Sequence, residues 1–281
     1  MTHDGRRHAI LAIDTATTQV VIATGSANGT ADGISTWAAG YRHGETLLPS
    51  IGRFLGEQNI RRSRLVGVVV GTGPGAFTGL RVGMATAKGL AHGLGIPLAG
   101  VSTGEALLEA SGVDRPVLLL PAGPSDRLVL RPGVAAQPLA KGDEPTVEAD
   151  ETLVALDLPD RAPADALERG EVARRGLGAA LIRLGAARLA DLAAQEPASG
   201  AQAHELETLV PDYVTLPRGV QAVGDGVAWS RDHQISSRGT PSRRPETRRV
   251  DPACGPQVSS RSSPHDAARA KHAWSPASSV A

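Results

Sequence analysis

The stretch GTGPGAFTGLRVG, residues 71–83, decides the fold of this chain, because its five glycines stand between two recognisable patterns. The apolar run LVGVVVG before it, residues 65–71, predicts a buried strand. Residues 78–95 after it repeat apolar side chains at spacings of three and four, which predicts a helix. A glycine cluster between a strand and a helix either binds a phosphate or lets two backbones approach closely.

The rest of the pattern weighs against a phosphate. Gly71, Gly73 and Ala76 fit the dinucleotide-binding spacing G-x-G-x-x-A. That motif also needs an acidic residue at the end of the next strand to hold the ribose, and LAGVS (98–102) offers none. Pro74 removes one backbone donor, and the G-K-S/T of a P-loop does not follow. The sequence therefore favours close backbone approach.

Strands and helices alternate on both sides of this stretch. Three strands are predicted in HAILAIDTA, TTQVVIATG and ADGISTWAAG, residues 8–40, with an Asn28-Gly29 hairpin turn. A helix is predicted in HGETLLPSIGRFLGEQN, residues 43–59, with Leu47, Leu48, Ile51 and Leu55 on one face and Pro49 in the first turn. The strand IPLAGVS and the helix TGEALLEAS follow. This alternation indicates parallel strands covered by helices.

The second half of the chain is less regular. PVLLLPAG (116–123) and RLVLRPG (127–133) predict two short strands, and residues 176–195 predict a helix rich in alanine and leucine. From Val220 onward there are eleven serines and six prolines, with nine basic against five acidic residues, 9 − 5 = +4. A segment of this composition buries too little apolar surface to fold, so we expect disorder over 220–281.

Charge and cysteine content exclude several classes of protein. The 281 residues hold 29 basic and 29 acidic side chains, so no global field attracts nucleic acid or a membrane. One cysteine, Cys254, rules out a disulfide framework or a thiolate metal cluster and fits a reducing compartment. The apolar runs are too short for a signal peptide or a membrane helix. We expect a cytoplasmic protein that does not bind membranes.

Ser102 has two interpretations. G-V-S-T-G, residues 100–104, has the form of a nucleophile elbow, and aspartates and His204 follow in the order that a hydrolase needs. Ser102 and Glu105 also form the capping box S-x-x-E at the start of a helix. Capping explains the same residues without an oxyanion loop, so it is preferred. A serine hydrolase using Ser102 remains an alternative.

Histidines do not form a metal site in this sequence. His43 and Glu45 begin a helix, but Leu47 stands where a second histidine ligand belongs. His204 is followed by Thr208 at the equivalent position. We expect no metal.

The helix after the glycine stretch carries a row of small residues. Two interpretations are open: the row packs inside the chain, or it receives a partner's helices together with the neighbouring helix. We favour the second, and expect Gly83→Arg to abolish partner binding while the chain still folds. The predicted interface consists of Leu47, Leu48, Ile51, Gly79, Leu80, Gly83, Met84 and Ala87.

IDTATT, HGETLLP and GTGPGAFTGLRVGMATAKGLAHGLGIPLAGVS together resemble the TsaB (YeaZ) family, strongly over residues 8–111. PDYVTLPR loosely matches the family's closing P-x-Y-x-R. The resemblance implies an α/β, actin-like ATPase fold (ASKHA, ribonuclease H-like) with two subdomains. We expect subdomains at 1–113 and 114–219, followed by the disordered tail.

The same resemblance implies a function. It implies a non-catalytic dimerisation subunit of the complex that transfers a threonylcarbamoyl group to the adenosine next to the anticodon of tRNAs. The implied partners are a TsaD-type catalytic subunit and a TsaE-type ATPase, with tRNA reached through the complex and a homodimer left open. TsaD-type chains bind metal through H-x-E-x-H, and here that string is H-G-E-T-L.

The implied nucleotide site is vestigial. Asp14 and Thr15 correspond to the first phosphate loop of the fold, where the resemblance implies weak ATP or ADP binding and no required cofactor. PAGPSDRL lacks the D-A-R string that the family often shows. A free-standing actin-fold kinase or ATPase using Asp14 remains the other alternative.

Overall fold

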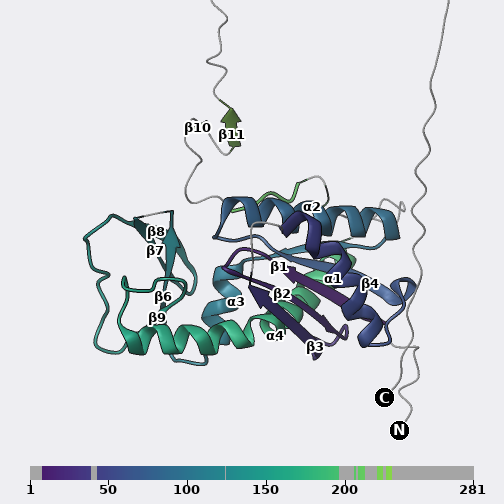
Figure 1. Ribbon diagram of the computed structural model, residues 1–281, viewed down its shortest axis with the longest axis horizontal. Helices are drawn as coiled ribbons and strands as arrows, with labels where there is room; N and C mark the ends of the chain where they lie inside the picture. Colours follow the sequence, from purple (N-terminus) through teal and green to yellow (C-terminus); the bar gives the residue numbers. More distant parts are fainter. Residues whose placement is uncertain are drawn as a thin grey trace, which may run out of the picture. The chain divides into compact units, whose positions relative to one another are not determined.

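The computed structural model describes residues 8–38, 43–123, 125–195, 206, 208–212, 220–223 and 226–229. A five-stranded sheet in the order β3-β2-β1-β4-β5 forms the larger part (Figure 1). Its strands are β1 (Ala9–Asp14), β2 (Gln19–Gly25), β3 (Ala31–Ala38), β4 (Leu65–Gly71) and β5 (Leu98–Val101). The β1–β2 and β2–β3 pairs are antiparallel, and the β1–β4 and β4–β5 pairs are parallel. The predicted strands and their alternation are confirmed.

Helices cover both faces of this sheet, because side chains alternate along each strand. Leu11, Ile13 and Val68 pack in one cluster with α1 (His43–Glu57) and α2 (Phe77–Leu94). Ile10, Ala12 and Val69 pack on the opposite face, in a cluster with residues of α3 (Thr103–Ala110) and α4 (Ala164–Gln195). The result is a three-layer α/β/α arrangement.

A second sheet has the strand order β8-β7-β6-β9. Its strands are β6 (Pro116–Ala122), β7 (Asp126–Arg131), β8 (Val134–Leu139) and β9 (Thr152–Ala155). β6 and β7 confirm the two predicted strands, whereas β8 and β9 were not predicted because their polar and proline residues hide the alternation. Between β8 and β9 the chain has no helix, and residues 140–151 form turns and irregular backbone.

The helix α4 joins the two sheets. It contacts β9 of the second sheet and also β1, β2 and β4 of the first. It begins at Ala164, well before the predicted start at Gly176. The first part of the helix has the sequence ADALERGEVARR, and its buried residues include Gly170 and Arg174. Because glycine and arginine are not apolar side chains, the buried face of this part shows no apolar repeat in the sequence.

Two details of α1 differ from the sequence analysis. Pro49 is the seventh residue of the helix rather than part of its first turn, and it is exposed. The helix continues through it because Leu47, Ile51 and Phe54 are buried against the sheet. Leu48 was expected on the same buried face, but its side chain is 54% exposed.

Part of the segment expected to be disordered is described in the structure. β10 (Val220–Val223) and β11 (Gly226–Trp229) pair antiparallel. The Gly-Asp dipeptide between them in the sequence is a hairpin turn signal that the composition analysis overlooked. The expectation of a tail without regular structure is therefore wrong for these strands. The rest of 220–281 and Cys254 lie outside the described residues.

Candidate functional site

The candidate site is built around Asp14, the last residue of β1. Its side chain is completely buried. One carboxylate oxygen, Oδ2, accepts a hydrogen bond from the Thr103 hydroxyl at 2.6 Å, and Oδ1 accepts one from the Ala16 backbone N–H at 2.9 Å. Burial raises the pKa of the Asp14 carboxyl, because desolvation outweighs the two hydrogen bonds that favour the charged form. Asp14 is therefore satisfied by this chain's own groups.

The glycine stretch packs directly on this carboxylate. A Cβ atom at Gly71 would collide with Asp14 Oδ2 and contact the Thr103 hydroxyl, and one at Gly75 would collide with the Ala16 carbonyl. The Ala76 N–H donates to that same carbonyl at 2.7 Å. The glycines thus permit close contact between the β4–α2 loop and the β1–β2 turn, as the sequence predicted.

The small residues of α2 face the same turn. The Thr15 hydroxyl donates to the Gly79 carbonyl at 2.7 Å, and Cβ atoms at Gly79 or Gly83 would collide with Thr15. Seven of the eight predicted interface residues are buried within this one chain. The eight are Leu47, Leu48, Ile51, Gly79, Leu80, Gly83, Met84 and Ala87, of which Leu48 alone is exposed.

The interface prediction is therefore wrong for the inward-facing residues. The small row packs inside the chain, which is the alternative that the sequence left open. An arginine at Gly83 would have to displace the Thr15 side chain, so we now expect Gly83→Arg to destabilise the folded chain.

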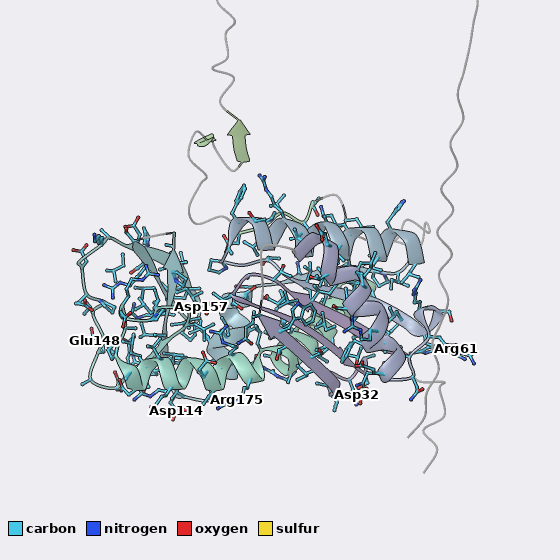
Figure 2. All side chains as sticks on the ribbon, in the orientation of Figure 1. Asp32, Arg61, Asp114, Glu148, Asp157 and Arg175 are labelled. Atoms are coloured by element: carbon cyan, nitrogen blue, oxygen red, sulfur yellow. The ribbon has the colours of Figure 1, made fainter. Side chains whose placement is uncertain are left out.

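A second group of polar residues connects the two sheets. Thr18 lies on the β1–β2 turn, and its backbone N–H donates to Asp157 Oδ2 at 2.9 Å. Asp157 follows β9 and lies where the two sheets meet (Figure 2). Arg174 of α4 reaches Asp157 Oδ1 with Nη2 at 2.6 Å and the Thr18 hydroxyl with Nη1 at 3.3 Å. We call Thr18, Asp157 and Arg174 the polar clasp.

The polar clasp is nearly dry. The Arg174 and Asp157 side chains are 6% and 7% exposed. Asp157 also has a φ of +56°, in the left-handed region that an aspartate adopts more readily than most residues. A buried ion pair of this kind fixes geometry, since either charge alone would be costly in this environment. The β1–β2 turn is thereby tied to the second sheet by protein side chains.

Ser102 caps α3. Its hydroxyl oxygen accepts a hydrogen bond from the Glu105 N–H at 3.3 Å, and the hydroxyl donates to the Gly73 carbonyl at 3.2 Å. Its backbone is extended, as an N-cap requires. The capping interpretation accounts for both contacts.

Among the residues that the structure describes, groups of three or more His, Cys, Asp or Glu placed to hold a metal ion do not occur. Their helices also include none that is long and apolar enough to cross a membrane. His43 begins α1, but its side chain and His204 lie outside the description.

Several known proteins share sequence similarity with parts of this chain. The sequence model of TsaD, tRNA N6-adenosine threonylcarbamoyltransferase, matches residues 11–135. The tRNA threonylcarbamoyladenosine biosynthesis protein TsaB of Escherichia coli is 36% identical over 94 residues, which cover 34% of this chain and 40% of that protein. An uncharacterized protein of Mycobacterium leprae is 42% identical over 109 residues, 37% of this chain and 29% of that one. The chain is thus similar to the TsaB protein of Escherichia coli and, over residues 11–135, to the TsaD family model.

A solved structure extends the likeness in fold beyond the TsaB-like region. An uncharacterized protein with similarity to peptidase YEAZ from Pseudomonas aeruginosa has a TM-score of 0.52 and 22% identity. The match covers 74% of this chain and 99% of that one. It supports the α/β fold with two sheets described above. The matches to these two curated relatives span less than half of each relative's length.

Three functional residues were missed in the sequence. Thr103 donates a hydrogen bond to Asp14, but in the sequence it belongs to no motif of its own and follows the capping residue Ser102. Asp157 and Arg174 are 17 positions apart and bond a turn more than 130 residues earlier, so no local pattern links them. The available signal for Arg174 was its position: it is an arginine on a helical face that otherwise carries small and apolar residues.

Proposed function

We propose that this chain is a non-catalytic subunit of the machinery that adds the threonylcarbamoyl group to adenosine in tRNAs. In this proposal it supports a TsaD-type catalytic subunit in the cytoplasm, with a TsaE-type ATPase as a further partner and tRNA bound through the complex. The proposal leaves a homodimer open. The proposal rests on the TsaB-like sequence and on the geometry at Asp14.

The single observation that carries the proposal is the burial of Asp14. The resemblance places Asp14 in the first phosphate loop of the actin-like fold, and a kinase or ATPase of this fold would use that carboxylate. Here it is fully buried, accepts bonds from Thr103 and Ala16, and lies directly against Gly71. A carboxylate whose acceptor sites are used by protein donors, and whose charge is disfavoured by burial, is poorly suited to metal-assisted phosphate chemistry.

The N-terminal part of α1 supports the same assignment. Leu47 occupies the second ligand position of the TsaD-type string H-x-E-x-H, and its side chain is 1% exposed in the core under α1. An apolar side chain packed on the sheet cannot contribute to a metal site. A ligand position of the catalytic paralogue is thus a structural position in this chain.

The structure also suggests a revised partner surface. Leu48, Gly52 and Gly56 form an i, i+4 row on α1, and Cβ atoms at the two glycines would meet open space. Ala85, Gly89 and Gly93 form a matching row on α2, where the two glycines also face open space. All but Leu48 are glycine or alanine, and we call these six residues the outer small rows.

Solvent-facing glycines in a helix cost about 1 kcal/mol each relative to alanine, so their presence needs a compensating use. The helices α1 and α2 are neighbours on one face of the sheet. Small rows on neighbouring helices allow the helices of another subunit to approach closely. We propose that a TsaD-type partner docks on the outer small rows rather than on the buried row.

The first experiment tests the function. The full chain would be combined with a TsaD-type partner, a TsaE-type ATPase, tRNA and the threonylcarbamoyl donor, and modified adenosine would be measured. We expect modification to require both this chain and the partner, and to continue with Asp14→Asn. Modification that proceeds equally well without the chain would contradict the proposal.

The second experiment tests the surface. Gly89→Arg should leave the fold intact, since its side chain enters open space, and should weaken partner binding at least tenfold. The control is Arg175→Glu on α4, on the opposite side of the sheet (Figure 2). Circular dichroism would follow folding and titration calorimetry would follow binding. Unchanged affinity in the Gly89 variant would place the interface elsewhere.

The alternatives have distinct signatures. A free-standing kinase or ATPase would bind ATP tightly in the isolated chain and lose binding in Asp14→Ala. A serine hydrolase would react with a fluorophosphonate at Ser102. The contacts of Asp14 and Ser102 described above favour neither.

A further inference from the structure

The second subdomain contains a cavity of about 560 Å³ that the proposed function does not use. It is lined by the start of β7, by the irregular segment after β8 and by the residues that lead into α4. Ser125, Arg127, Lys141, Glu144, Asp160 and Arg161 contribute its polar groups. A cavity of this volume holds a small molecule.

Arg127 holds the walls of this cavity in place. Its Nη1 donates to the Arg161 carbonyl at 2.9 Å, and its Nη2 donates to the Asp143 carbonyl. These two acceptors belong to two segments that both contribute residues to the cavity lining. The guanidinium therefore joins the cavity's walls through neutral carbonyl groups.

The charge of Arg127 is less completely neutralised than that of two other arginines. Arg174 meets the buried carboxylate of Asp157 at 2.6 Å, and Arg131 meets Glu151, 7% exposed, at 2.8 Å. The carboxylate nearest to Arg127 is Glu144 at 3.5 Å, and its side chain is 80% exposed. The Arg127 side chain is only 7% exposed. A buried cation without a close buried anion attracts a charged ligand.

Further basic groups lie around the same cavity. Lys141 is exposed and makes no hydrogen bond or ion pair with the described part of the chain. Together with Arg127 and Arg161 it gives three basic side chains against Glu144 and Asp160, 3 − 2 = +1. The Ser125 hydroxyl adds a neutral donor. The polar lining is thus weighted toward donors and positive charge.

We propose that this cavity binds a small anion that carries a phosphate or carboxylate group, with Arg127 beneath it and Lys141 at its rim. The surroundings argue for a small ligand. The segment from Asp143 to Glu151 also carries Glu144, Glu148 and Asp150, whose negative charges would repel a polyanion such as tRNA. A small anion with one or two charges contacts only the cavity and is repelled less by these acidic residues than a polyanion is.

The test uses the full chain and two probes, inorganic phosphate and succinate, which distinguish phosphate from carboxylate recognition. Titration calorimetry at low salt should detect binding of at least one probe with a Kd of about 1 mM or tighter. Lys141→Glu should weaken that binding at least tenfold without lowering the melting temperature, since Lys141 is exposed. Lys88→Glu, on α2 and outside the cavity, is the matched control and should bind like the wild type.

Each outcome decides the proposal. Binding of one probe, lost in Lys141→Glu and kept in Lys88→Glu, supports it and names the recognised group. Equal weakening in both lysine variants would show a general charge effect and overturn it. Absence of heat with both probes at ten times the expected Kd, or binding unaffected by Lys141→Glu, would also overturn it. None of these results depends on activity of the proposed tRNA-modification complex.

Discussion

The two sheets share a strand order but are held together by different chemistry. β8-β7-β6-β9 repeats the arrangement β3-β2-β1-β4, with two antiparallel pairs followed by one parallel pair. In the first sheet a helix, α1, follows the third strand, and α2 follows the fourth. In the second sheet the third strand leads into irregular backbone, and only the fourth is followed by a helix, α4.

The loops show the contrast most clearly. In the first subdomain, Gly75 and Gly79 let backbones meet directly, and Gly71 leaves room for the Asp14 carboxylate. In the second subdomain, arginines hold the irregular segment. Arg131 donates to the Thr146 carbonyl at 2.6 Å and pairs with Glu151, and Arg127 holds the neighbouring walls. A glycine lets two segments touch but has no side chain that could adapt if they move. An arginine spans a gap between segments and offers several N–H donors. The two halves should therefore fail differently when they are perturbed.

The largest expected effect is at the polar clasp, where the two halves meet. Arg174→Met leaves the Asp157 carboxylate buried without its cation, so we expect a loss of about 4 kcal/mol in the free energy of unfolding. Chemical denaturation would measure it. Arg175→Glu, exposed on the same helix, is the control. A loss as small as that of the control would show that the clasp does not join the two sheets.

The glycine contacts should give the next largest effect. A Cβ atom at Gly79 would collide with the Thr15 carbonyl, which belongs to the backbone and cannot rotate away. We expect Gly79→Ala to cost about 3 kcal/mol. Gly89→Ala, in the same helix but facing open space, should instead be neutral or stabilise by about 1 kcal/mol. Similar melting temperatures for the two variants would refute close packing at this turn.

Opposite pH dependences should separate the halves further. Arg131 lowers the pKa of Glu151 from 4.5 to about 2, so the folded state holds this carboxylate's proton less tightly than the unfolded state does. Its contribution to stability is present above pH 4.5 and is lost as the pH falls toward 2. Glu151→Gln should therefore lose stability relative to wild type above pH 4.5 and converge with it at about pH 2.

Asp14 should behave in the reverse sense. Burial raises its pKa above 3.8, so its contribution favours folding at low pH and weakens as the pH rises through the raised value. Asp14→Asn should thus gain stability relative to wild type between pH 3.8 and neutral pH. Denaturation curves across this range would measure both variants, and the same direction of change in each would contradict the assigned environments.

The smallest expected effect concerns the cap of α3. Ser102→Ala removes the acceptor for the Glu105 N–H and should cost about 1 kcal/mol. Ser102→Asp should retain the cap, since aspartate accepts the same bond. Thermal unfolding of the two variants would distinguish them. Loss of the proposed complex activity in the aspartate variant, with unchanged stability, would reopen a chemical role for this serine.

The sequence by itself determined the first sheet and its helices. There, apolar side chains recur with the periods of strands and helices, and the glycine stretch indicates that two segments of the chain approach closely. The TsaB resemblance came from the same region. Only the tertiary structure decided which way the small rows face, because Leu48 and Leu47 are adjacent in sequence but opposite in exposure. It also decided the polar clasp and the arginine-held cavity. Those contacts join residues far apart in the chain, and an ion pair between distant elements leaves no period in the sequence.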